Sequence, residues 1–334
     1  MNDSIRDAQT TAASDTPQIP QEIALTGASG FVGRHLITCL LQAGFRVRAI
    51  TRNPAGLPLQ PGLQAIAHPG FGTAADWRSA LGGVTAVIHC AGIAHVPLGA
   101  GRTSLQQLRQ VNVAGVRELA RAAAACDVQQ IMFLSSIKAA GEYSLPGQPL
   151  RETDQPRPED CYGYAKLAAE HHLARLARQH SNLKITTLRP PLIYGRGVKA
   201  NFAALVKLAQ SGLPLPLGAI DNQRSFLYVG NLADAVLTVL NEPERAGGLF
   251  HLSDGPGVST PELIRAIAEA AGKPARLLSI PTGLLGTTAS LAGKQGVWQR
   301  LAGSLAVDNQ AFCQRFGWQP PYTLQEGLAD MLAG

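Results

Sequence analysis

A glycine-rich loop placed directly after a short apolar segment most constrains how this chain can fold. The apolar segment is Ile23-Ala24-Leu25, and the loop after it reads Thr26-Gly27-Ala28-Ser29-Gly30-Phe31-Val32-Gly33. Gly27 suits the tight turn out of a strand, Gly30 lets the backbone approach a phosphate, and Gly33 lets a helix pack closely on a sheet. A helix that begins here directs its free N–H groups at the anion. The loop therefore predicts a strand–turn–helix unit that binds the pyrophosphate of a dinucleotide.

Apolar strand patterns and amphipathic helix patterns alternate between residues 22 and 189. We expect strands at Glu22–Thr26, Arg46–Thr51, Ala86–His89, Gln130–Ser135 and Lys184–Arg189. We expect helices at Gly30–Ala43, Ala75–Leu81, Leu105–Cys126 and Tyr162–Arg178. Strands separated by helices form crossover units and a parallel sheet covered on both faces. The predicted fold class is α/β, a Rossmann-type doubly wound parallel sheet with a smaller C-terminal α/β substrate-binding lobe.

The pattern changes after Pro190, where short helical segments alternate with loops rich in proline and glycine, such as 212–218 and 255–257. At 334 residues and 46% hydrophobic content, the chain is long enough to bury two cores. We expect a Rossmann domain over 21–190 and a nucleotide-sugar-binding lobe over 191–334, with segments such as 224–252 returning to the first domain. Residues 1–20 are rich in Ser, Thr, Asp, Ala and Gln, which predicts a disordered tail.

The charge and the cysteine content indicate which binding partners and which cellular location to expect. The net charge is +6, but the basic residues are scattered and form no Lys/Arg run interleaved with aromatic residues. This pattern indicates solubility or a small anionic ligand rather than a nucleic acid. The five cysteines form no Cys-x-x-Cys pair and are odd in number, which favours reduced thiols, a cytoplasmic location and no metal site. Gly, Pro or charge interrupts the apolar stretches, so we expect no membrane insertion.

Three polar residues carry the predicted chemistry. Tyr162 and Lys166 are four residues apart in an expected helix, so they share one face. We expect the Lys166 ammonium to lower the pKa of the Tyr162 phenol, which can then exchange a proton with an alcohol or carbonyl oxygen. Ser136 follows an expected strand and lies at the carboxyl edge of the sheet, where such folds bind ligands. With the glycine loop, these residues predict hydride and proton transfer at a C–OH or C=O centre with a nicotinamide dinucleotide.

From about residue 22 to the C-terminus, the chain resembles the extended short-chain dehydrogenase/reductase family of sugar-nucleotide epimerases, dehydratases and reductases. Besides the glycine loop and Tyr162 with Lys166, the matching motifs are His89-Cys-Ala91-Gly92, Asn112-Val-Ala-Gly115, Ser135-Ser136, Arg189-Pro190-Pro191-Leu-Ile-Tyr194-Gly195, Arg224-Ser-Phe-Leu-Tyr228-Val and Phe316-Gly-Trp-Gln-Pro320 with Glu326-Gly327. The resemblance implies that Ser136, Tyr162 and Lys166 are catalytic. It implies cofactor contacts by Gly27, Ser29, Gly30, Phe31, Val32, Gly33, Arg52, Ala91, Gly92, Asn112, Tyr162, Lys166 and Pro190.

The resemblance also implies a UDP-sugar substrate and residues that grip its pyrophosphate. Asn201 and Arg224 stand at matching positions, and Arg300 is a further candidate. An Arg side chain suits this role because its paired donors match phosphate oxygens. The alternative for Arg224 is a surface ion pair. Lys138 lies next to Ser136 and either contacts the substrate or is a solvated side chain.

Departures from the family pattern narrow the reaction. In the 4,6-dehydratases of this family an Asp-Glu pair follows the catalytic Ser or Thr, whereas this chain has Ile137 and Lys138, so we do not expect dehydration. Segments 135–142, 197–202 and 213–218 are similar to bacterial O-antigen enzymes that reduce the 4-keto group of UDP-4-keto-6-deoxy-N-acetylhexosamines. The alternative is a UDP-sugar 4-epimerase with tightly bound NAD. Leu192 stands where many epimerases carry a substrate-binding Asn, which favours the reductase. An alternative of another class is a catalytically idle dinucleotide-binding sensor or scaffold.

The residues after the second expected strand bear on the choice of cofactor. In many dinucleotide-binding folds an Asp or Glu about twenty residues after the glycine loop holds the adenosine ribose of NAD. Here the sequence reads Thr51-Arg52-Asn53, without an acid. Arg52 suits a 2′-phosphate, which favours NADP(H), with NAD(H) possible.

Two of the expected helices bear on assembly. Leu105–Cys126 and Tyr162–Arg178 both have apolar faces. In relatives the equivalent helices form a four-helix interface, so the resemblance implies a homodimer. The alternative is that both faces only cover the sheet.

Overall fold

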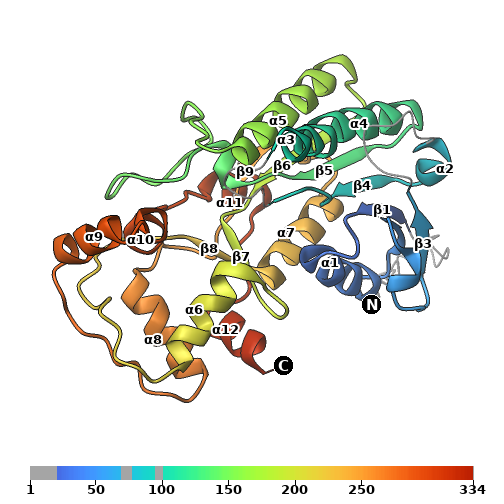
Figure 1. Cartoon of the computed structure of the whole chain (residues 1–334). Coiled ribbons are helices and arrows are strands. Elements are labelled where there is room, and N and C mark those ends of the chain that lie inside the picture. The colour runs from blue at the N-terminus through green and yellow to red at the C-terminus, as the bar shows by residue number, and fades with distance from the viewer. Residues whose placement is uncertain (1–20, 69–76, 95–100, 334) are drawn as a thin grey trace, which may run out of the picture.

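The computed structural model describes residues 21–68, 77–94 and 101–333, and a seven-stranded parallel sheet forms its centre (Figure 1). The strands are β1 (Glu22–Thr26), β2 (Arg46–Thr51), β3 (Leu63–Ala67), β4 (Ala86–His89), β5 (Gln130–Leu134), β6 (Lys184–Arg189) and β9 (Gly248–His251). Their order is β3-β2-β1-β4-β5-β6-β9, so the strand order reverses between β1 and β4. Ile23 of β1 lies opposite Val47 of β2 and Ala86 of β4. This reversal opens the crevice in which doubly wound sheets bind ligands.

Helices cover both faces of this sheet, as Figure 1 shows. One face packs against α1 (Phe31–Gln42), α7 (Val229–Asn241) and α11 (Gln310–Phe316). The other packs against α2 (Trp77–Leu81), α4 (Val116–Ala125) and α5 (Cys161–Gln179). Side chains alternate between the two cores: Ile131 and Phe133 of β5 face α4 and α5, whereas Met132 faces the opposite side. The predicted α/β Rossmann-type class is therefore confirmed.

A third core lies in the C-terminal part of the chain. Strands β7 (Leu192–Tyr194) and β8 (Phe226–Tyr228) form a separate parallel pair. They pack with α6 (Ala200–Gln210), α8 (Thr260–Ala270) and α12 (Leu324–Leu332) around Tyr194 and Phe202. Helices α9 (Thr282–Leu291) and α10 (Gln295–Ala302) lie beyond this core, at the end of the molecule opposite β3 (Figure 1). From segment 224–252, α7 and β9 return to the large sheet.

The structure adds elements that the sequence patterns do not predict. Strands β3, β7, β8 and β9 are not expected from the sequence, because their segments follow proline- or glycine-containing loops that hide the strand pattern. The helix expected at Leu105–Cys126 begins earlier, as α3 (Arg102–Arg109), and reaches α4 through a π-helical turn. The expected tail 1–20 and the first two residues of the helix expected at Ala75–Leu81 lie outside the described residues.

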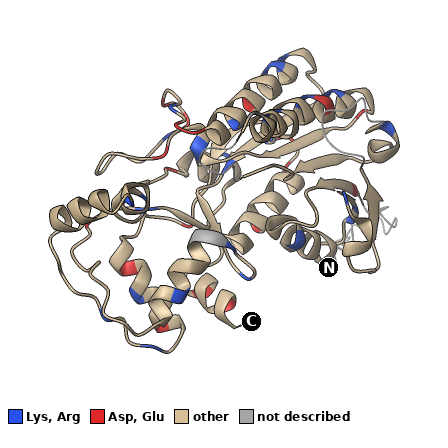
Figure 2. Ribbon diagram, viewed as in Figure 1, with Lys and Arg blue, Asp and Glu red and all other residues tan. Residues whose placement is uncertain are grey.

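Charged residues of both signs are interspersed over the ribbon in the view of Figure 2. Within the described ranges, no helix combines the length and the apolar character that crossing a membrane requires.

Candidate active site

The glycine loop after β1 is built from close backbone approaches. Gly27 has a φ of +72°, and a Cβ atom there would lie 2.7 Å from the backbone nitrogen of Ala91. A Cβ atom at Gly33 would collide with the backbone of Gly27, so this glycine lets α1 pack onto the loop. Gly30 is the N-cap of α1 and provides no side-chain hydrogen bond to the first turn. The N–H groups of that turn are therefore available to an anion.

The segment after β4 is held by Asn112 from the π-helical turn Gln110–Gly115. The buried Asn112 amide accepts a hydrogen bond from the Ile93 nitrogen at 2.8 Å and donates one to the Ile93 oxygen at 2.9 Å. A Cβ atom at Gly92 would lie 3.3 Å from Asn112 Oδ1 and 3.6 Å from Lys166 Nζ. Asn112, Gly92 and Lys166 thus meet at one point. Single π-turns of this kind occur frequently at functional sites.

Ser136 and Tyr162 meet at the carboxyl edge of the sheet. Ser136 lies two residues after the end of β5 and caps the short 3-10 helix Ile137–Ala139. Its hydroxyl accepts a hydrogen bond from the Lys138 nitrogen at 3.3 Å. Tyr162 lies in the first turn of α5, whose N-cap Asp160 accepts a hydrogen bond from the Gly163 nitrogen at 2.7 Å. Burial raises the pKa of Tyr162 to about 12, although its hydrogen bond with the Ser136 side chain lowers it. The phenol is therefore protonated at neutral pH.

Lys166 is buried one turn after Tyr162. Its Nζ donates a hydrogen bond to the Leu134 oxygen at 2.8 Å and lies 4.6 Å from the centre of the Phe133 ring. The Nζ atom is 5.9 Å from the centre of the Tyr162 ring. Burial lowers the pKa of Lys166 to about 8, against the opposing effects of Cys90 and Glu170. The pKa of the phenol is therefore raised rather than lowered as expected, because desolvation of the phenol is the largest effect on it.

Lys138 is paired with two carboxylates, and its side chain remains 38% exposed. Its Nζ lies 2.7 Å from Asp160 Oδ2 and 3.0 Å from Glu142 Oε1. Burial would lower the pKa of Lys138, but the hydrogen bonds to the two carboxylates raise it overall. At the same contact, a Cβ atom on Gly163 would lie 2.5 Å from the Lys138 oxygen, so only glycine fits. The Lys138–Asp160 pair joins the turn that carries Ser136 to the helix end that carries Tyr162.

A buried ion pair behind the site, absent from the residues predicted from the sequence, anchors α5. Arg189 at the end of β6 contacts Glu170 through Nε at 2.9 Å and Nη2 at 2.5 Å, and both side chains are almost completely buried. The Ser135 hydroxyl also donates to Glu170. His251 of β9 lies beside Arg189, and burial lowers its pKa to about 4. Glu170 follows Lys166 by four residues, so the helical spacing could have indicated it.

Two further residues expected at the cofactor lie at the ends of strands. Arg52 directly follows β2 and is exposed, and the adjacent Thr51 donates a hydrogen bond to the Ser29 hydroxyl at 3.2 Å. The end of β2 therefore contacts the glycine loop. Pro190 follows β6, and its oxygen accepts a hydrogen bond from the Ile137 nitrogen at 2.9 Å. Pro190 thus lies against the turn that begins at Ser136.

The three residues expected at the substrate pyrophosphate lie in the C-terminal lobe. Arg224 forms no ion pair with any residue that the structure describes, so the alternative of a surface ion pair is wrong there. Its Nη1 donates a hydrogen bond to the Gly303 oxygen at 2.9 Å. Burial lowers the pKa of Arg224. Arg300 is exposed on α10. Asn201 falls in the first turn of α6, and its side chain lies outside the described residues.

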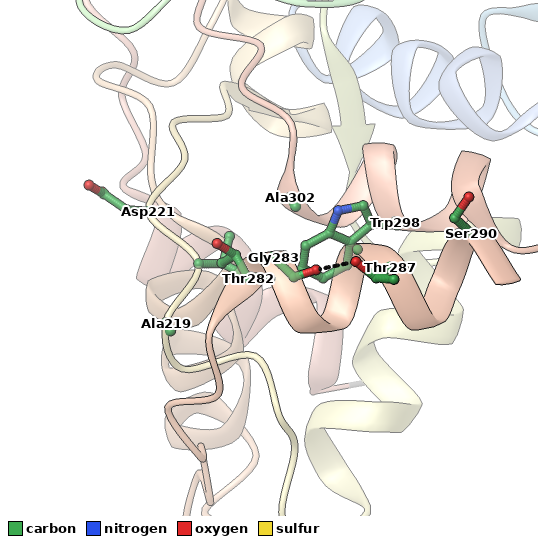
Figure 3. A pocket seen from close by; sticks show the side chains of 10 residues that line it. Ala219, Asp221, Thr282, Gly283, Thr287, Ser290, Trp298 and Ala302 are labelled. Atoms are coloured by element: carbon green, nitrogen blue, oxygen red, sulfur yellow. Dashed lines mark hydrogen bonds between the residues drawn. The ribbon is translucent and has the colours of Figure 1, made fainter. Parts of the chain in front are cut away.

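A cavity of about 720 Å³ lies between α9, α10 and the loop before β8 (Figure 3). Its polar lining comes from Thr282, Thr287, Ser290 and Asp221, and its aromatic lining from Trp298. Thr287 donates a hydrogen bond to the Gly283 oxygen at 2.9 Å. Gly303, the partner of Arg224, directly follows α10. The cavity therefore borders the part of the lobe that contains Arg224.

The parallel sheet, its reversal point and the glycine loop define a dinucleotide-binding protein of the Rossmann type. The chain belongs to the NAD dependent epimerase/dehydratase family, which matches residues 23–252. This result confirms the extended short-chain dehydrogenase/reductase resemblance and identifies the chain as an enzyme of the epimerase/dehydratase type. The more specific O-antigen reductase type remains a prediction.

Individual relatives resemble almost the whole chain. A UDP-glucose 4-epimerase of Vibrio cholerae is 38% identical over 317 residues, which is 93% of this chain and 94% of the relative. An N-acetyl-α-D-glucosaminyl-diphospho-ditrans,octacis-undecaprenol 4-epimerase of Escherichia coli O157:H7 is 26% identical over 92% of each chain. The solved structure of MoeE5 in complex with UDP-glucuronic acid and NAD is 25% identical, with a TM-score of 0.73 over 93% of this chain and 98% of MoeE5.

Proposed function

We propose that the chain reduces the 4-keto group of a UDP-linked 4-keto-6-deoxy-N-acetylhexosamine to an alcohol. The observation that carries the proposal is the convergence of Ser136, Tyr162 and Lys166 at the carboxyl edge of the sheet, beside the glycine loop. A bound nicotinamide dinucleotide would supply the hydride. The loop around Gly27 and Gly30 would hold its pyrophosphate, and Lys166, 3.6 Å from the Cβ position of Gly92, would contact its ribose.

The protonation states suit reduction. The pKa of Tyr162, raised to about 12 by burial, keeps the phenol protonated, so it can donate a proton to the substrate O4 as the hydride reaches C4. The Ser136 hydroxyl, which is hydrogen-bonded to the phenol, would hold the same oxygen. The C=O bond takes up one hydride and one proton and becomes an alcohol. The resulting phenolate is then reprotonated from solvent.

The residues after Ser136 support reduction over dehydration. Elimination of water needs an acid and a base near the sugar ring, and this chain has Ile137 and Lys138 there. Ile137 is buried in a small apolar cluster, and Lys138 is occupied by Asp160 and Glu142. The two positions that carry acids in a dehydratase therefore carry no carboxylic acid in this chain.

The C-terminal lobe offers a place for the nucleotide end of the substrate. Arg224, Arg300 and the cavity lined by Trp298 provide two guanidinium groups for a diphosphate and an aromatic face for a base. The segment after α10 contacts the loop between β5 and α5, which begins at Ser135 and Ser136, because the Ala306 nitrogen donates to the Ser144 hydroxyl at 2.8 Å. A UDP-sugar is further supported by MoeE5, which was solved with UDP-glucuronic acid or UDP-glucose bound.

A 4-epimerase acting on a UDP-sugar is the second candidate, because the Vibrio cholerae relative at 38% identity is a UDP-glucose 4-epimerase. The same Ser–Tyr–Lys set can serve both reactions, since epimerisation oxidises C4 and then reduces it. Leu192, 43% exposed, has no hydrogen-bonding group where many epimerases carry Asn. This difference favours the reductase. An idle sensor or scaffold has no need for the converged catalytic residues.

One assay separates these candidates. The purified chain is mixed with reduced cofactor and a UDP-4-keto-6-deoxy-N-acetylhexosamine, and absorbance at about 340 nm reports cofactor oxidation. The reductase consumes one cofactor per keto sugar. Interconversion of UDP-N-acetylglucosamine with its C4 epimer, without net cofactor consumption, would establish the epimerase. Absence of both reactions in a folded, dinucleotide-binding protein would favour the sensor.

We propose NADP(H) as the reduced cofactor because the exposed Arg52 directly follows β2 and its neighbour Thr51 contacts the glycine loop. The structural relatives include complexes with NAD, so the preference rests on Arg52 alone. Titration of NADPH and NADH by fluorescence tests it, with Arg52→Ala as the variant. Tighter NADH binding that the substitution leaves unchanged would refute the phosphate role. We also place the reaction in the cytoplasm, where reduced dinucleotides and free thiols occur together.

A further inference from the structure

Helices α9 and α10 form an apolar projection that is attached to the C-terminal lobe through α10, where Trp298 and Ala302 pack against the third core. Neither helix contains a buried residue, although α9 reads Thr-Gly-Leu-Leu-Gly-Thr-Thr-Ala-Ser-Leu. Figure 1 places both helices at the outer end of the C-terminal lobe, and Figure 2 shows α9 without a charged residue along its length. A helix of this composition is normally covered by a core or by another surface.

The exposed side chains of this projection are large and apolar. Leu284 is 60% exposed and Leu291 is 85% exposed. They are seven residues apart, so they lie on one face of α9. The opposite side of α9 is taken by α10, since a Cβ atom on Gly286 would lie 3.1 Å from Trp298 Nε1. Three more exposed apolar residues belong to α10 and to the neighbouring loops: Val297, Leu278 and Leu213.

The same part of the chain is basic and lacks acidic residues. Between Glu269 and Asp308 there is no Asp or Glu, whereas Lys273, Arg276, Lys294 and Arg300 are present and exposed. This segment accounts for four of the six net positive charges of the whole chain. Asp221 lies in the lining of the adjacent cavity. Exposed leucines among cations are typical of surfaces that bind anionic phospholipids.

We propose that the α9–α10 projection docks on an anionic phospholipid surface, with Leu284 and Leu291 in the interface and Lys294 and Arg276 near the headgroups. Contact of this kind is peripheral and needs no membrane-spanning helix. A second copy of this chain is a poor occupant of the same face, because a symmetric contact would bring four more cations against the first four, and residues 270–307 contain no acid to pair with them. The proposal is independent of the reaction assigned above.

Sedimentation of the full-length chain with lipid vesicles tests this surface at low salt. The probes are vesicles of phosphatidylcholine alone and vesicles of phosphatidylcholine with phosphatidylglycerol. We expect binding to the anionic vesicles and roughly tenfold weaker binding to the neutral ones. The double variant Leu284→Asp/Leu291→Asp should weaken binding to the anionic vesicles by roughly tenfold or more. The double variant Arg276→Glu/Lys294→Glu should weaken it similarly.

The matched control is Leu59→Asp, because Leu59 is an exposed leucine as well but lies in the loop between β2 and β3. Its binding to vesicles should equal that of the unaltered chain. Circular dichroism of each variant establishes that it is folded, and the replaced leucines make few contacts. Absence of binding to anionic vesicles would overturn the proposal, as would binding that the Leu284 and Leu291 substitutions leave unchanged. A lower mass of that variant in light scattering without lipid would instead identify an interface between copies.

Discussion

The phenol of Tyr162 is the group on which the proposed proton transfer depends. Replacing it in Tyr162→Phe removes the proton donor and leaves the glycine loop intact. Turnover should fall by roughly 10²-fold or more, the usual scale for loss of a general acid, while dinucleotide affinity changes little. Tyr164→Phe is the matched control, because Tyr164 lies on the same helix and is 60% exposed. Turnover of Tyr162→Phe near that of the control would exclude Tyr162 as the donor.

The pH dependence of reduction should report Lys166. Burial lowers the pKa of Lys166 to about 8, so its ammonium is lost as the pH rises through that value. The pKa of Tyr162 is raised to about 12, so the phenol stays protonated over the same range. We expect kcat for reduction to be level below about pH 8 and to fall above it. A level profile to about pH 10, measured at saturating substrate and cofactor, would show that the ammonium is not required. Arg52→Ala should leave the descending limb in place.

For single residues, spacing in the sequence predicts some contacts of the candidate site and misses others. Tyr162 and Lys166 stand one helical turn apart, and Ser136 follows a strand, so sequence patterns alone bring them together. The partner of Lys138 cannot be found in this way, because Asp160 is 22 residues away and meets it only after β5 and α5 are in place. The pKa of Tyr162 could not be predicted either. It depends on burial, which sequence spacing does not measure.

Helix α5 is the element that connects the site to the core. Its buried Glu170 binds Arg189 of β6 and Ser135 after β5, so one side chain connects α5 to two segments of the sheet. Both members of the ion pair are almost completely buried. Removing one charge leaves the other without a partner in a low-dielectric interior.

We predict that Glu170→Ala lowers the free energy of unfolding by about 3–5 kcal/mol, because Arg189 is then buried and unpaired. The double variant Glu170→Leu/Arg189→Met removes both charges and should cost less than the single substitution. Urea unfolding followed by circular dichroism measures both. Glu242→Ala removes a half-exposed partner of Arg245 and serves as the control, with an expected cost of about 0–1 kcal/mol. If Glu170→Ala is as stable as Glu170→Leu/Arg189→Met or more stable, an unpaired buried Arg189 is not what destabilises the chain.

Element by element, the first half of the chain is more predictable than the second. Strands β1, β2, β4, β5 and β6 each contain apolar residues and are separated by helical patterns, so their positions follow from the sequence. Strands β7 and β8 have three residues each, too few to show a period. The sequence does not predict the π-helical turn either, and Asn112 in this turn forms hydrogen bonds to Ile93, which lies 19 residues away.

At the scale of the whole molecule, the outer side of α3, α4 and α5 predicts a homodimer. The inner side of α4 and α5 covers the sheet through Leu119 and Leu173. The outer side carries a groove lined by Leu105, Val113 and the exposed Tyr164. Light scattering at micromolar concentration should give the mass of a dimer, and the double variant Tyr164→Glu/Ala168→Glu should give that of a monomer. A monomeric mass for the unaltered chain would contradict the prediction.

The central claim is that the chain delivers a hydride to C4 of a keto sugar, and isotope transfer tests it most directly. Reduced cofactor with deuterium at the transferable position is incubated with the UDP-4-keto-6-deoxy-N-acetylhexosamine, and the product is examined by nuclear magnetic resonance. We predict one deuterium at C4 of the sugar for each cofactor oxidised. A product without deuterium at C4, or a cofactor that keeps its deuterium while a UDP-sugar changes configuration, would contradict the proposed reduction.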